Sequence, residues 1–146
     1  MKGVIDMKNS EKATEHFNGG FNCAASVLSS FCEDYELDAE LAAKLACGLG
    51  GGCGDGEVCG AVSASVLIVG LKYGQHVPGD MGTKTNCYAK TKQFMDAFKE
   101  KHGVVTCRGL LAGVDGFGEE EALKERRRLC AQYVKDAAEI LEEQGY

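Results

Sequence analysis

Eight cysteines dominate the chemistry that this chain of 146 residues offers. Three of them stand at predicted helix starts: Cys23, Cys59 and Cys107. At a helix start, unpaired backbone N–H groups and the positive end of the helix dipole stabilise a thiolate. This placement predicts a thiol-based oxidoreductase or electron-transfer protein centred on Cys59, which we expect to be the thiol with the lowered pKa.

The remaining cysteines occupy different settings. Cys130 lies in the middle of a predicted helix on its apolar face, and Cys53 lies in a glycine-rich loop where we expect it to be exposed. Free cysteine often behaves as a small buried hydrophobe. That is our interpretation of the three at other helical positions: Cys32, Cys47 and Cys87.

The cysteine spacing matches no familiar metal or haem motif. The chain has no C-x-x-C pair, no H-E-x-x-H and no C-x-x-C-H, so covalent haem is not expected. Ligands from separate helices need only converge in space, so a four-cysteine iron–sulfur or zinc site is the alternative function. A helical interaction module with inert thiols is a third. The scattered histidines give no support to a Cys-His hydrolase: His16, His76 and His102.

The elements that must position these thiols are helices. Apolar residues recur at helical spacing and no convincing alternating strand is present, which predicts an all-α, single-domain bundle over residues 1–146. About six helices are expected, near residues 10–17, 22–31, 38–46, 58–73, 83–101 and 119–143, with a short one at 106–111. The segment 58–73 is apolar on nearly every side and should be the buried central helix. So much apolar surface is consistent with a homodimer.

Local signals mark where these helices begin. Ser10, Asn22, Asp38 and Thr106 are predicted N-caps because their side-chain oxygens suit the free N–H groups of a first turn. The glycine-rich stretch 48–56 lacks the G-K-[ST] ending of a phosphate-binding loop. We expect it to allow a close backbone approach at the start of the central helix, with an anion-binding nest as the alternative.

Charge and hydropathy narrow the classes of partner. The net charge of −6 gives no basic surface for nucleic acid. The basic triplet 126–128 follows the acidic triplet 119–121, which favours a solvated helix face, with an anion site as the alternative. The longest apolar stretch, 58–71, is shorter than the roughly 20 residues that a membrane span needs. Residues 1–6 begin no apolar run, so we expect no signal peptide and a cytoplasmic protein with reduced thiols and an unspecified redox partner.

Several separated segments also carry a family resemblance. They are residues 20–24, 50–52, 57–63, 70–74 and 106–111, followed by Cys130. In order and spacing they resemble a family of redox-active proteins named for its C_GCAxxG_C_C cysteine pattern and similar to part of the split-Soret cytochromes. The resemblance implies four functional cysteines: Cys23, Cys59, Cys107 and Cys130. Ala64 stands where the motif has its last glycine, a change that a helix should tolerate.

Overall fold

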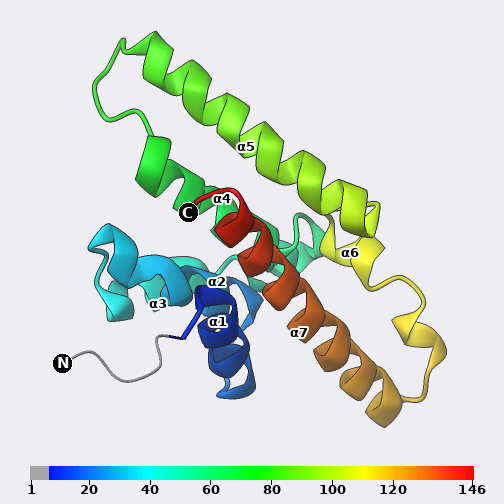
Figure 1. The fold of residues 1–146 in the computed structure, drawn as a ribbon. Coiled ribbons are helices and arrows are strands. Elements are labelled where there is room, and N and C mark those ends of the chain that lie inside the picture. Colours follow the sequence, from blue (N-terminus) through cyan, green and yellow to red (C-terminus); the bar gives the residue numbers. More distant parts are fainter. Residues whose placement is uncertain (1–6) are drawn as a thin grey trace.

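The computed structural model describes residues 7–146, which form seven α-helices joined by short turns (Figure 1). The helices are α1 (Asn9–Asn18), α2 (Cys23–Phe31), α3 (Ala39–Cys47), α4 (Gly60–Tyr73), α5 (Met81–His102), α6 (Cys107–Leu110) and α7 (Glu119–Glu143). Within this part of the chain the only β pairing is an isolated antiparallel bridge between Val58 and Thr106. The all-α prediction is therefore confirmed.

The centre of the bundle is shared by α2 and the first half of α4. Helix α2 packs against α1, α3, α4 and α7, and it buries Leu28 and Phe31 almost completely. Helix α4 buries seven residues between Gly60 and Val69, whereas Leu67 and Leu71 are each 41% exposed. The predicted central helix thus starts at Gly60 instead of residue 58, and its last turns leave the core beside α5 (Figure 1).

Three of the four predicted N-caps are confirmed. The side chains of Asn22, Asp38 and Thr106 each accept a hydrogen bond from the backbone N–H three residues later. The prediction for Ser10 was wrong, because α1 begins one residue earlier with Lys8 at the N-cap position. Ser10 is instead buried within the first turn of the helix.

A buried polar contact joins the end of α5 to α7. The Nε2 atom of His102 lies 2.9 Å from Oδ2 of Asp136, and the Gln132 side-chain amide donates a 2.8 Å hydrogen bond to the other carboxylate oxygen. Asp136 is only 3% exposed. The His102 ring also packs edge-on against Tyr133, at 4.9 Å between ring centroids. These contacts fix the rotation of α7 around its axis, and with it the direction of Tyr133.

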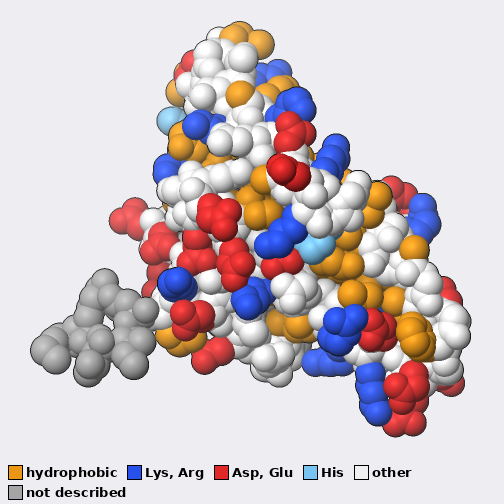
Figure 2. Space-filling model, turned by 45° about the vertical axis from the view of Figure 1, so that its right-hand side comes forward, with side chains coloured by type: hydrophobic (Ala, Val, Ile, Leu, Met, Phe, Trp, Pro, Cys, Tyr) orange, Lys and Arg blue, Asp and Glu red, His pale blue; other side chains and the backbone are white. Residues whose placement is uncertain are grey.

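The surface mixes charge types. On the face shown in Figure 2, Lys and Arg side chains are interspersed with carboxylates and apolar side chains. Among residues 7–146, no helix combines the length and the apolar character that crossing a membrane requires. The expectation that residues 1–6 carry no signal peptide lies outside the described residues.

Candidate functional site

Four cysteines from four separate segments line one pocket of about 370 Å³. Cys23 is the first residue of α2, Cys59 is the N-cap of α4, Cys107 is the first residue of α6, and Cys130 lies within α7. The same elements can be followed in Figure 1. They are the four cysteines that the sequence singled out, and the other four cysteines do not line this pocket.

The isolated β-bridge holds Cys59 beside Cys107. The backbone N–H of Cys59 donates to the Val105 carbonyl at 2.7 Å, and that of Cys107 donates to the Glu57 carbonyl at 2.6 Å. Sequence analysis missed this pairing because a single bridge needs no alternating pattern. It brings together two thiols that are far apart in the sequence.

Glycine at position 60 allows Cys23 to approach Cys59. A Cβ atom at Gly60 would lie 2.6 Å from the Cys23 Sγ and 3.0 Å from the Leu49 carbonyl oxygen. A second close approach occurs at Gly52, where a Cβ would lie 2.9 Å from the Cys107 Cβ and φ is +64°. The predicted role of the glycine-rich stretch, a close backbone approach at the start of α4, is confirmed.

The same stretch forms a tight turn that carries Cys53 away from the pocket. Residues Gly52–Gly56 form a single π-helical turn in which Cys53 adopts a φ of +59°. Cys53 is exposed, as the sequence predicted, and it does not line the pocket. The Arg108 guanidinium donates a 3.0 Å hydrogen bond to the Asp55 carbonyl, which ties the turn to α6.

Burial makes Cys59 a weak acid. Desolvation raises its pKa from 9.0 to about 12, and the nearby Cys23 adds to this rise. Hydrogen bonds from the backbone N–H groups of Ala61 and Val62 lower the pKa by a smaller amount. The expected helix-start stabilisation therefore exists, but the prediction of a low pKa for Cys59 was wrong because its side of the pocket is dry.

The electrostatic centre of the site is Cys23. A charge on this thiol raises the pKa of Cys59, Cys107 and Cys130. For Cys130 the largest cause is burial, and the pKa rises to about 11. Cys23 is partly exposed, whereas Cys59 is only 6% exposed. Cys23 is thus the pocket thiol whose charge acts on the other three, and it is more accessible than Cys59.

Two arginines of α7 also line the pocket. Arg126 lowers the pKa of Cys107 and Cys130, and Arg127 lowers that of Cys130. All three arginines of the basic triplet are exposed, as the interpretation of a solvated face predicted, but only Arg128 pairs with a carboxylate of its own helix. The missed signal was the spacing from Cys130, because residues three and four positions apart share a helix face.

The cysteine arrangement does not form a ready metal site. Among residues 7–146, no group of three or more His, Cys, Asp or Glu side chains lies close enough to hold a metal ion. All eight cysteines are free thiols in the structure.

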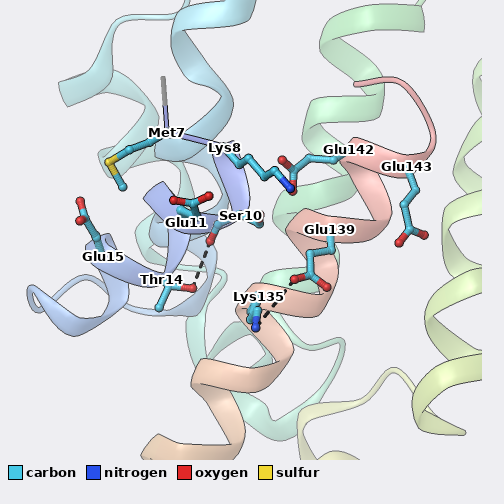
Figure 3. Close-up of a pocket in the computed structure, with 10 residues that line it drawn as sticks. All are labelled: Met7, Lys8, Ser10, Glu11, Thr14, Glu15, Lys135, Glu139, Glu142 and Glu143. Carbon is cyan, nitrogen blue, oxygen red and sulfur yellow. Dashed lines mark hydrogen bonds and ion pairs between the residues drawn. The ribbon is translucent and has the colours of Figure 1, made fainter. Parts of the chain in front are cut away.

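A second cavity, of about 800 Å³, lies between α1 and α7 (Figure 3). It is lined mostly by charged side chains, including Glu11 and Glu15 from α1 and Glu139 from α7. Lys135 lies 3.9 Å from Glu139 across one turn of α7. No cysteine lines this cavity, so the thiol chemistry belongs to the smaller pocket.

Comparison with known proteins gives one family. The family model described as "Putative redox-active protein (C_GCAxxG_C_C)" matches residues 21–144, a range that contains all four pocket cysteines. No curated protein and no solved structure matches the chain.

Proposed function

Because the chain belongs to the C_GCAxxG_C_C family of redox-active proteins, we propose that its pocket carries out thiol–disulfide exchange. The observation that supports this most strongly is the placement of Cys23 within electrostatic range of the three other pocket thiols. In such an exchange a thiolate attacks a disulfide, and a second thiol displaces the resulting mixed disulfide. The pocket supplies both thiols within one chain.

The two steps fall to different residues. Cys23 is the attacking thiol, because it is partly exposed at the pocket and heads a helix of nine residues. Cys59 is the resolving thiol, because with a pKa of about 12 it stays neutral until its proton leaves during the second attack. The substrate disulfide takes up two electrons and two protons and leaves as two thiols, while a Cys23–Cys59 disulfide forms.

The test is oxidation of the reduced protein by 2-hydroxyethyl disulfide, a small neutral oxidant. Differential alkylation and mass spectrometry then identify which thiols were lost. We expect the pocket cysteines to be lost fastest, and we expect Cys23→Ser to slow that loss by more than about tenfold. Cys47→Ser is the matched control, because Cys47 is exposed and lies outside the pocket. Equal rates for Cys23→Ser and the unaltered chain would refute the assignment.

A metal site is the alternative function for the same four cysteines. Their convergence on one pocket favours it, whereas the absence of a ready ligand group among residues 7–146 speaks against it. Anaerobic purification followed by a visible spectrum and by iron, zinc and sulfide analysis separates the two. If the protein contains stoichiometric metal and Cys23→Ser loses it, metal binding is the function of the pocket and thiol exchange is not.

The proposed cycle also needs a reductant to restore the thiols. In the cytoplasm, glutathione and thioredoxin systems keep thiols reduced. We therefore propose that the protein works in the cytoplasm with a redox partner that returns two electrons to the Cys23–Cys59 disulfide.

A further inference from the structure

The cations of α7 differ in whether they have a carboxylate partner. Arg128 pairs with Glu125, and Lys124 lies within 3.9 Å of Glu120 and 3.7 Å of Glu121. Within residues 7–146, Arg126 and Arg127 form no ion pair. These are the two cations that line the cysteine pocket.

Packing holds one of these arginines in place. The guanidinium carbon of Arg127 lies 5.7 Å from the centroid of the Phe17 ring, a cation–π contact between α7 and α1. Burial raises the pKa of Cys107 and Cys130, and the charge of Arg126 opposes part of this rise in both. Arg127 therefore packs against the pocket wall, and Arg126 lies close enough to two pocket thiols to act on their charge.

The other pocket walls are apolar. Besides the thiols and arginines, they consist largely of aromatic and aliphatic side chains: Phe17, Phe21, Leu110, Leu111, Leu123 and Tyr133. Binding sites for small molecules typically have volumes of about 300–1,000 Å³ and combine such apolar walls with a few charged groups. A pocket of about 370 Å³ suits a small molecule.

We infer that the preferred substrates are small disulfides that carry a carboxylate beside an apolar body. This inference rests on the proposed thiol exchange and names its substrate class. Arg126 and Arg127 bind the carboxylate, since guanidinium groups match carboxylates in charge and shape. The apolar walls hold the hydrocarbon part next to Cys23.

The bond changes follow from this placement. The Cys23 thiolate attacks one sulfur, the substrate S–S bond breaks, and a carboxylate-bearing thiolate leaves with the electron pair and takes up a proton. The Cys59 thiol then loses its proton and attacks the Cys23 sulfur of the mixed disulfide. A Cys23–Cys59 disulfide forms and the second carboxylate-bearing thiol leaves.

The charge of the whole chain predicts the opposite preference. A net charge of −6 repels anions and attracts cations over long distances. If anionic disulfides react faster than neutral ones, the local positive field of Arg126 and Arg127 must outweigh the charge of the whole chain. The sign of the charge preference therefore decides whether the pocket arginines select the substrate.

The experiment compares three disulfides of similar size: anionic 3,3′-dithiodipropionate, neutral 2-hydroxyethyl disulfide and cationic cystamine. Each rate constant for oxidation of the reduced protein is divided by that of free 2-mercaptoethanol, which corrects for intrinsic reactivity. We expect the anionic compound to react about fivefold faster or more than the neutral one, and cystamine to react slowest. High salt should reduce this preference.

Matched variants locate the cause. In the double variant Arg126→Gln, Arg127→Gln we expect the ratio of the anionic to the neutral rate constant to fall to about one or below. Arg128→Gln removes the neighbouring charge, which is paired with Glu125 and does not line the pocket, and should keep the preference. An equal loss in Arg128→Gln would overturn the inference, because whole-chain charge would then explain the rates.

A binding measurement separates failure of the inference from failure of the proposed function. Suberate has the chain length and charges of 3,3′-dithiodipropionate but no disulfide, so it binds without exchange. It should protect Cys23 from iodoacetamide, whereas neutral 1,8-octanediol should protect far less. Exchange with the neutral disulfide but no charge preference or protection refutes only the substrate class. Protection without any exchange refutes thiol exchange and leaves the anion-binding pocket standing.

Discussion

Opposing forces act on the thiol of Cys59. The N–H groups of the first α4 turn stabilise its thiolate, while burial destabilises it more strongly. A buried thiol of this kind gains from staying neutral. It has to lose its proton before it can attack a sulfur of a disulfide. A neutral thiol of this kind suits the resolving step better than the first attack.

This pKa predicts an alkaline loss of stability. The folded-state pKa of Cys59 is about 12, against an ordinary value of 9.0, so the thiol ionises first in unfolded chains as the pH rises. The contribution is complete below pH 9 and disappears between pH 9 and pH 12, to a total of at most about 4 kcal/mol. We expect the free energy of unfolding of Cys59→Ala, measured in urea from pH 7 to 10.5, to fall less steeply above pH 9 than that of the unaltered chain. Parallel curves would contradict the assigned pKa.

Gly60 offers a test of the close packing between two thiols. The Cβ in Gly60→Ala would lie 2.6 Å from the Cys23 Sγ, so we expect a loss of about 1–3 kcal/mol in stability and slower disulfide formation. Gly70→Ala is the control, because a Cβ there meets nothing within 4 Å. It should be neutral or stabilising by up to about 1 kcal/mol, given the better helix propensity of alanine. Similar unfolding midpoints for both variants would show that the space beside Gly60 accommodates a Cβ without loss of stability.

At the scale of elements, the ends of helices can be predicted from local sequence signals, whereas the contacts between helices cannot. The bounds of α7 were predicted to the residue, since its apolar spacing and acidic first turn are local signals. The start of α4 was misplaced because an apolar run does not distinguish an N-cap from a first turn. Ala64 is fully buried within an unbroken α4, so alanine is tolerated at the last motif position.

The candidate site was predictable only in part. The family resemblance supplied the identity of the four cysteines, but the approach of Cys23 depends on Gly60, and a single β-bridge brings Cys59 beside Cys107. Neither contact has a local sequence signal, because each joins segments that are distant along the chain. The two pocket arginines were hidden for the same reason within a run of charged residues.

The contact between α5 and α7 predicts a large effect of one buried carboxylate. Asp136→Ala leaves the side chains of His102 and Gln132 without their partner, and should lower the free energy of unfolding by about 2–4 kcal/mol. Asp96→Ala is the control, because Asp96 forms an exposed ion pair with Lys92 and its loss should cost at most about 1 kcal/mol. Urea denaturation measures both. A small effect at Asp136 would mean that this contact does not hold the helices together.

At the scale of the whole molecule, the helices that form the pocket pack around one hydrophobic core. Side chains from α1, α2, α4, α5 and α7 belong to a single buried cluster. The homodimer and the single domain over residues 1–146 both stay predictions. For the dimer, apolar side chains exposed on α4 and α5 offer a surface: Leu67, Leu71, Met81 and Tyr88.

A shared core predicts that the walls of the pocket separate only when the whole molecule unfolds. In pulse alkylation across a urea series, the exposed Cys47 and Cys53 should react at every concentration. The buried Cys32 and Cys59 should become reactive together, at the midpoint of the loss of helical circular dichroism. Labelling of Cys59 at clearly lower urea than Cys32 would instead indicate that the pocket opens as a separate unit.

Helix α7 forms the part of the pocket wall that carries Cys130 and the two arginines. During synthesis on the ribosome, Cys23 and Cys59 emerge long before Cys130 and the two arginines. For that interval the early thiols have neither their dry surroundings nor their cationic neighbours. The four-cysteine pocket therefore cannot form on the nascent chain until α7 has left the exit tunnel.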